Sequence, residues 1–229
     1  DSVWSYEVGA KDELMDHNLR LNTSVYLIDW KNIQQVVGLS SCGFAYTSNL
    51  GAARSQGIDL QADLAFGRDW VAAVAVGYND TRYTQTVKAV TGSPVNLVSD
   101  GDHIVGWPWT VGASVQYNFQ LAGSWDSYAR LDYQYQAKQS DTVSGNNPRN
   151  GGYQPWAVFA LPEVSQLAAR VGTRVGGFDV SLFCNNVTNA HPVLAQGNSI
   201  NFGIPGELVG YFRSTLRPRT FGVTAAYRL

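Results

Sequence analysis

The stretch WTVGASVQYNFQL, residues 109–121, alternates strictly between apolar side chains and polar or small ones. Its odd positions are apolar from Trp109 to Leu121, whereas its even positions hold Thr, Gly, Ser, Gln and Asn. Successive side chains of a β-strand point to opposite faces, so a period of two predicts a strand with one apolar and one polar face. Residues 125–137 repeat the pattern, with Arg130 and Asp132 in the middle of the polar face.

Weaker copies of this alternation run along the rest of the chain and predict about nine strands and no helix. The predicted strands lie at 3–11, 19–27, 58–64, 70–78, 109–121, 125–137, 167–175, 178–182 and 221–229. Several have about ten residues or more, whereas strands of globular proteins usually have five or six. Charge in mid-strand opposite an unbroken apolar face favours a transmembrane β-barrel with a lipid-facing outside and a wet lumen. A soluble β-sandwich, whose strands also alternate, is the alternative.

The links between the predicted strands alternate between short and long. The short links are 12–18, 67–69, 123–124 and 176–177, and the long polar ones are about 38–53, 80–107, 139–163 and 187–217. Outer-membrane barrels have tight periplasmic turns and long extracellular loops. The long links are rich in Gly, Asn, Ser and Pro, which predicts irregular structure there. Aromatic residues such as Trp70 and Tyr78 mark the strand ends, where a lipid–water interface is expected.

The composition excludes several classes of protein. The 229 residues carry 16 Lys and Arg against 18 Asp and Glu, which argues against nucleic acid as a partner. No apolar run is long enough for a membrane-spanning helix.

If the short turns are periplasmic, the first strand begins outside the cell and the last ends in the periplasm, whereas complete bacterial barrels have both ends periplasmic. We therefore expect an open antiparallel sheet from a larger barrel.

Four segments, in order, resemble TonB-dependent outer-membrane receptors, and the opening YEVGAK (6–11) also fits. They are VYLIDWKNIQ (25–34), NLGAARSQGIDLQADL (49–64), VSLFCNNVTNA (180–190) and RPRTFGVTAAYRL (217–229). The resemblance covers nearly the whole chain as the last strands of a 22-stranded barrel, a type that is normally plugged. The chain departs from the family in ending with Leu229 rather than Phe, and nothing in it resembles the plug or the energy-coupling segment.

The resemblance implies a fold, a location and a function. Residues 1–229 would be the C-terminal portion of an all-β, antiparallel transmembrane barrel of the 22-stranded type in the bacterial outer membrane, with the plug domain absent from this chain. The parent would take up a scarce extracellular ligand of siderophore, cobalamin-like or glycan class by energy-coupled, plug-gated transport. Its expected partners are outer-membrane lipid, an N-terminal plug with the remaining barrel strands, a periplasmic energy-coupling protein and the small-molecule ligand, without nucleic acid. A passive pore or adhesin-like barrel without energy coupling is the alternative.

The residues offer no catalytic or metal-binding constellation. His17, His103 and His191 lie in three separate links without regular ligand spacing, and no nucleophile elbow of the G-x-S-x-G type is present. We therefore expect no enzymatic activity, no metal and no cofactor. A disulfide between Cys42 and Cys184 is possible, although free thiols are favoured.

Two groups of residues are candidate ligand contacts. Exposed rings in the long links could stack on a ligand, and these are Trp107, Tyr153, Trp156, Phe202, Tyr211 and Phe212. Charges on the lumen face could bind its polar groups, and Arg130 and Asp132 are the candidate contacts among them. The lumen-facing charges include Arg20, Asp59, Asp63, Arg130, Asp132, Arg170 and Arg174. The alternatives are loop packing for the rings, and for the charges a structural network of ion pairs that also braces a plug.

Overall fold

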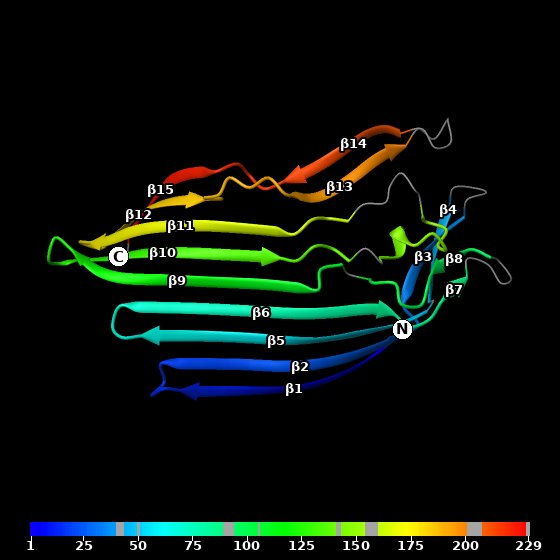
Figure 1. The fold of residues 1–229 in the computed structure, drawn as a ribbon, viewed down its shortest axis with the longest axis horizontal. Coiled ribbons are helices and arrows are strands. Elements are labelled where there is room, and N and C mark those ends of the chain that lie inside the picture. The colour runs from blue at the N-terminus through cyan, green and yellow to red at the C-terminus, as the bar shows by residue number, and fades with distance from the viewer. Residues whose placement is uncertain are drawn as a thin grey trace.

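The computed structural model describes residues 1–39, 44–49, 51–88, 94–104, 106–140, 143–153, 160–200 and 208–227. Within these residues nine strands form one antiparallel sheet, and Figure 1 shows them side by side. Most strands are longer than predicted, and their order in the sheet follows the chain. They are β1 (Ser2–Leu14), β2 (Leu19–Lys31), β5 (Ala52–Phe66), β6 (Trp70–Tyr83), β9 (Trp109–Leu121), β10 (Trp125–Gln136), β11 (Val164–Val175), β12 (Phe178–Asn185) and β15 (Thr220–Tyr227).

The short and long links lie at opposite ends of the sheet, as predicted. Tight turns close one end, where Gly67, Gly123 and Gly177 have positive φ angles that favour glycine. The long connections gather at the other end. In Figure 1 the N-terminus lies at the long-loop end and the C-terminus at the tight-turn end.

The prediction that the long links are irregular was wrong in part, because three of them contain a short hairpin. These are β3 (Gln34–Leu39) with β4 (Phe44–Asn49), β7 (Val87–Lys88) with β8 (Asn96–Val98), and β13 (Val193–Ile200) with β14 (Leu208–Thr215). The link between β10 and β11 holds a short 3-10 helix, Ser144–Asn146. Two strands of a hairpin satisfy each other's backbone hydrogen bonds without burying an apolar face, so hydrophobic periodicity does not reveal them.

The strand register gathers the apolar side chains on one face of the sheet. Val115, for example, lies opposite Ala72 on β6 and Leu131 on β10. This face remains uncovered, since 46% of Leu131 and 61% of Leu182 is exposed. The buried apolar residues of the described chain are few and small, namely Ile33, Ala53, Val98 and Ala137. A broad apolar face without a core beneath it suits contact with lipid rather than with water.

Paired aromatic rings mark both borders of the apolar face. Near the tight turns, Trp70 and Tyr117 have ring centroids 4.6 Å apart, and near the loops Tyr78 and Trp109 are 4.7 Å apart. Trp70 and Tyr78 lie on the same face of one strand, about 20 Å apart along the barrel axis for a strand tilted by about 40°. This separation is close to the apolar band of an outer-membrane barrel wall, which is about 25 Å tall. No helix in the described part of the chain is long and apolar enough to cross a membrane.

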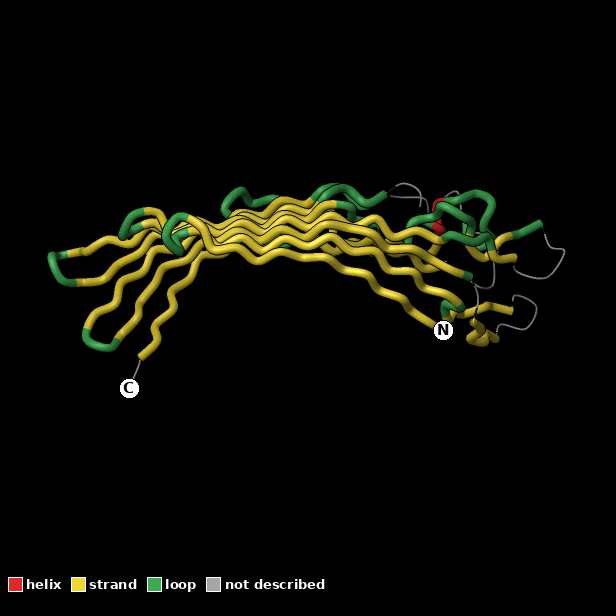
Figure 2. Tube along the Cα trace, turned by 90° about the horizontal axis from the view of Figure 1, so that it is seen from below, coloured by secondary structure: helices red, strands yellow, loops and turns green. Residues whose placement is uncertain are grey.

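The nine-stranded sheet is open, as predicted. Strands β1 and β15 form its two edges and do not pair with each other. Figure 2 shows the sheet as an arch rather than a closed barrel. The last strand pairs with β12, the preceding strand of the wall, while the β13–β14 hairpin lies apart from the sheet.

Candidate ligand-binding surfaces

The polar face of the sheet, which we call the lumen face, carries its charges on two flanks. One flank comprises β1, β2 and β5, with Glu7, Lys11, Glu13, Arg20, Asp59 and Asp63. The other comprises β10, β11 and β12, with Asp126, Arg130, Asp132, Arg170, Arg174 and Asp179. Between them β6 and β9 contribute mainly small or uncharged side chains, such as Ala75, Gly77, Gly112 and Ser114.

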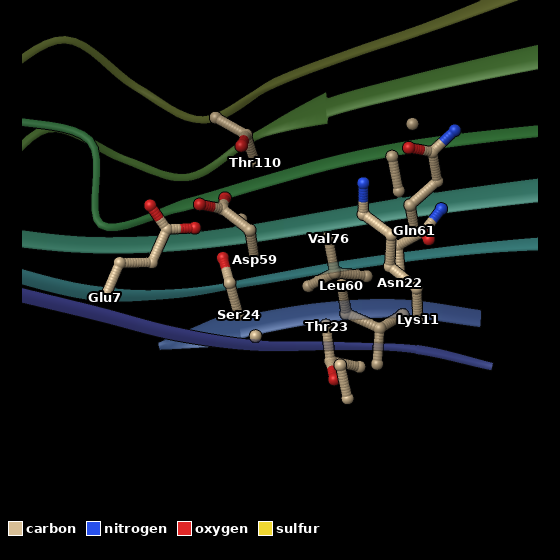
Figure 3. Close-up of a pocket in the computed structure, with 15 residues that line it drawn as sticks. Glu7, Lys11, Asn22, Thr23, Ser24, Asp59, Leu60, Gln61, Val76 and Thr110 are labelled. Carbon is tan, nitrogen blue, oxygen red and sulfur yellow. The ribbon is translucent and has the colours of Figure 1, made fainter. Parts of the chain in front are cut away.

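A groove of about 630 Å³ lies over the first flank and reaches the uncharged middle strip. Gly77 forms part of its floor, and a Cβ atom there would lie 3.0 Å from Thr110 Oγ1 and 3.3 Å from Asp59 Oδ1. Figure 3 shows the oxygen atoms of Glu7, Ser24, Asp59 and Thr110 turned toward one end of the groove. The absence of a side chain at Gly77 therefore lets a carboxylate and a hydroxyl converge on a surface that polar groups can approach.

The two predicted lumen contacts, Arg130 and Asp132, bind each other. Arg130 Nε lies 2.9 and 3.0 Å from the carboxylate oxygens of Asp132, and Nη2 lies 2.6 Å from Oδ1. Both side chains are more than one-third exposed, so the pair remains accessible from the lumen. Their partnership lies within one strand, whereas Arg20–Glu13 and Arg174–Asp179 join neighbouring strands at 3.2 and 3.1 Å.

Arg170 is held differently from the other lumen arginines. Its Nη1 donates to Ser181 Oγ at 3.0 Å, and its guanidinium carbon lies 5.5 Å from the ring centroid of Phe183. Arg170 also lies directly opposite Arg130 on the neighbouring strand. Within the described residues it has no carboxylate partner, so this part of the lumen offers a cation to an anionic group.

The predicted loop aromatics fall into three sets. Trp107 and Tyr153 are partly buried in the connections that follow β6 and β10. Phe212 lies on the β13–β14 hairpin with 64% of its surface exposed. Trp156, Phe202 and the side chain of Tyr211 lie outside the described parts of the chain. Among the described residues, all ring pairs lie on the outward face of the wall, so the structure does not bring Trp107, Tyr153 and Phe212 into contact with one another.

A polar junction that the sequence reasoning missed joins two of the long connections. The buried carboxylate of Asp102, in the connection after β6, accepts hydrogen bonds from Asn147 and Asn150 Nδ2, both at 2.6 Å, in the connection after β10. It also accepts from the Ser99 backbone N–H at 2.8 Å and from Ser144 Oγ at 3.1 Å. We call these residues the Asp102 junction. Turn-forming residues are abundant at both places, but no local pattern links positions 45 or more residues apart.

Electrostatics keep the Asp102 junction ionised. Burial opposes the charged form of Asp102, but the hydrogen bonds from the side chains of Asn147, Asn150 and Ser144 and from the Ser99 backbone together outweigh it. The pKa of Asp102 therefore lies below the usual aspartate value. A buried carboxylate with four donors fixes the two connections as one unit, and Trp107 and Tyr153 lie in these same connections.

The described residues contain no group of three or more His, Cys, Asp or Glu arranged to hold a metal ion. His17 bonds Glu13 within a turn, and His103 lies 3.2 Å from Asp80 and 3.0 Å from Ser140 Oγ. Cys184 is a free thiol on the outward face, and Cys42 lies outside the described residues.

Three solved structures are similar to this chain over nearly its whole length. The ferric yersiniabactin uptake receptor FyuA from Yersinia pestis has a TM-score of 0.69 and 14% identity over 97% of this chain and 29% of its own. The ferric-catecholate import receptor Fiu from E. coli has a TM-score of 0.64 and 18% identity over 96% of this chain and 27% of its own. The ferripyoverdine receptor of the outer membrane of Pseudomonas aeruginosa has a TM-score of 0.64 and 15% identity over 97% of this chain and 26% of its own. At these identities the likeness concerns the fold, and this chain spans less than a third of each of these receptors.

The sequence comparison identifies the family more specifically than the fold does, although no curated protein matches the sequence. The family model described as TonB dependent receptor-like, beta-barrel matches residues 2–187, which include eight of the nine wall strands. The match covers most of the chain and agrees with the resemblance of segments 6–11, 25–34 and 49–64, whereas segment 217–229 lies beyond it. The two-faced antiparallel wall and this match together show that the chain belongs to the TonB-dependent receptor-like β-barrel family.

Proposed function

We propose that residues 1–229 are the C-terminal portion of the barrel of an outer-membrane receptor that takes up a scarce extracellular ligand. The observation that carries the proposal is the open wall of a TonB-dependent receptor-like barrel, with a polar lumen face and paired aromatic borders on its apolar face. The two unpaired edges, β1 and β15, would join the remaining strands of a 22-stranded barrel in the parent protein. Unpaired backbone groups cost several kcal/mol each in hydrocarbon, so such edges need partners.

The transport mechanism that we propose is the one that the family resemblance implies. A ligand would bind first among the long connections and then pass along the lumen face after an N-terminal plug is moved by a periplasmic energy-coupling protein. The similar solved receptors are named for ferric yersiniabactin, ferric catecholates and ferripyoverdine, which makes a siderophore the first class to test. Cobalamin-like and glycan ligands are the other classes. The chain itself would have a transport role rather than a catalytic one.

Particular residues have separate roles in the proposed uptake. Trp107 and Tyr153 lie in connections that the Asp102 junction holds together, so they would form a fixed part of the outer binding surface. Phe212, on its own hairpin, would reach the ligand from another side. Trp156, Phe202 and Tyr211 would complete this aromatic surface, and Arg130 with Asp132 would contact polar groups of the ligand deeper in the lumen.

Uptake measurements test the proposal. Cells that produce the protein would be offered radiolabelled ferric siderophores, cyanocobalamin and oligosaccharides, with and without a protonophore. We expect saturable uptake of one class, abolished by the protonophore. Uptake that is unsaturable and insensitive to the protonophore would favour the passive pore, and cell adhesion without uptake would favour the adhesin.

Variants connect that uptake to the predicted contacts. Replacing Trp107, Tyr153 and Phe212 together by Ala should weaken ligand binding about tenfold or more, since each ring that stacks contributes roughly 0.5–1.5 kcal/mol beyond its buried area. Tyr46→Ala is the control, because Tyr46 is a half-exposed ring on the β3–β4 hairpin outside the predicted set. Equal weakening by the control would contradict the assignment of these rings.

A further inference from the structure

Charged side chains continue the outward face of the sheet beyond its loop-side aromatic border. Arg54 and Arg82 are directly opposite each other on β5 and β6, four residues beyond the opposed pair Ile58 and Tyr78. Four residues of a strand tilted by about 40° rise about 10 Å. The two guanidinium groups therefore lie just outside the apolar band, on the side of the wall that faces the membrane.

Each arginine is held by a carboxylate that leaves its outer end open. Arg54 Nε lies 2.8 Å from Asp29 Oδ1, and Arg82 Nε lies 2.7 Å from Asp80 Oδ1. The arginine side chains are 51% and 49% exposed, whereas Asp29 and Asp80 are 30% and 14% exposed. The carboxylates are thus the more buried members of both pairs, and about half of each arginine side chain remains exposed.

The group formed by the two ion pairs and a neighbouring lysine has an excess of positive charge. Like charges directly opposite on neighbouring strands repel each other, and Arg54 and Arg82 are such a pair. Exposed Lys31 on β2 shares the outward face and lies diagonal to Arg54, because it pairs with Ala52. With Asp29 and Asp80 counted, the group has three positive and two negative charges. A phosphate that accepts hydrogen bonds from both guanidinium groups would remove the repulsion.

We propose that Lys31, Arg54 and Arg82, the outward basic patch, bind the phosphate group of a lipid headgroup in the outer leaflet. The proposal rests on the proposed function in requiring that the sheet be a wall embedded in a membrane. A lipid is the source of phosphate that fits, because the patch continues the lipid-facing side directly above the aromatic border. Trp4, directly opposite Asp29 and 64% exposed, adds an interfacial ring beside it.

Lipid binding by the purified receptor tests the proposal. The receptor containing this chain would be placed in phosphatidylcholine nanodiscs with or without phosphatidic acid, whose headgroup is a phosphate monoester. Native mass spectrometry would count the bound phosphatidic acid. We expect R54Q/R82Q to lower the affinity for phosphatidic acid at least about tenfold, equivalent to about 1.4 kcal/mol. R149Q/R213Q, which removes the same charge from the connections, should leave it unchanged.

Further variants keep the result decisive if R54Q/R82Q does not fold. The quadruple variant D29N/R54Q/D80N/R82Q preserves the net charge and removes the unpaired carboxylates, and it should show the same loss. R54K/R82K keeps the charge but loses the two-pronged geometry, and it should retain only part of the affinity. Full affinity in the quadruple variant would overturn the proposal.

Two readouts separate the possible failures. A heat-resistant compact band of the wild-type receptor on gels reports a closed barrel, so its absence would refute the proposed function. A compact wild-type receptor that binds no phosphatidic acid would refute only the lipid site. Inorganic phosphate that binds the patch in detergent as tightly as the lipid does would show a site for free phosphate, and would also overturn the proposal.

Discussion

Placing a cation at Ala113 separates the two faces of the wall most clearly. Ala113 lies on the apolar face of β9, four residues from both Trp109 and Tyr117, whose ring pairs mark the two borders of that face. Four residues of a tilted strand rise about 10 Å, so Ala113 lies midway between the borders. An arginine at the midplane on the lipid face of an outer-membrane barrel costs about 2–4 kcal/mol, and near the interface about 0–1 kcal/mol. Ala113→Arg should therefore lower the free energy of unfolding by about 2–4 kcal/mol, whereas Leu121→Arg, four residues beyond Tyr117, should lower it by less than about 1 kcal/mol.

The matched control is Ser114→Arg on the lumen face of the same strand. Ser114 lies opposite Asp132, so the new guanidinium meets water and a carboxylate. Gln116 would be a poorer control, because it lies opposite Arg130. Denaturant titration of the receptor in lipid vesicles, followed by tryptophan fluorescence, measures the difference. Equal destabilisation by Ala113→Arg and Ser114→Arg would refute the assignment of the two faces.

Two further predictions concern the loops and the lumen face. Asp102→Ala should lower the local stability of the joined connections by about 2–4 kcal/mol, because several amide donors lose their buried acceptor. Hydrogen exchange of the loop amides measures this change. Asp100→Asn is the control and should change the local stability little, because Asp100 is exposed. Since the pKa of Asp102 is lowered by folding, the stability it confers is fully present above the unfolded pKa of about 3.9 and is lost as the pH falls through the folded value. The protection of the loop amides, which is obtained from their exchange rate after correction for the intrinsic pH dependence of amide exchange, should therefore fall only under acid conditions. A fall in protection between neutral and basic pH would contradict this linkage. Gly172→Ala should lower the free energy of unfolding by about 1–3 kcal/mol in the same denaturant titration, because the ring of Tyr128 covers Gly172. Gly112→Ala is the control. A methyl group there meets open space, so the free energy of unfolding should change by no more than about 0.5 kcal/mol. Equal costs for both alanine variants would show that the ring is not held against the glycine.

The wall could be predicted because its signals are local. Period-two alternation gives each strand and both of its faces, as in residues 109–121, and turn residues such as Gly67 and Gly123 give the tight ends. The strand ends were harder to predict. Strand β5 begins at Ala52 rather than near residue 58, because beyond the aromatic border both faces meet polar surroundings and the alternation stops while backbone pairing continues.

The candidate site could be predicted only in part, because no local sequence pattern specifies which of its side chains bind each other. The sequence placed Arg130 and Asp132 on one face, but only the tertiary structure shows that they bind each other rather than residues of neighbouring strands. It placed Trp107 and Tyr153 in long links, but gave no sign that the Asp102 junction unites these links.

The sequence alone determined the strand number of the wall, its two faces, its direction and its resemblance to TonB-dependent receptors, because each of these follows from residues adjacent along the chain. Only the tertiary structure decided which charges pair, which connections join, and that Arg54 and Arg82 lie side by side outside the apolar band. The opposition of Arg54 and Arg82 depends on register, and the Arg54–Asp29 pair and the Asp102–Asn147 hydrogen bond join residues 25 or more positions apart. Many polar residues of the chain could form such contacts, and the local sequence does not distinguish among them. The folded structure decides which donors and acceptors lie within hydrogen-bonding distance.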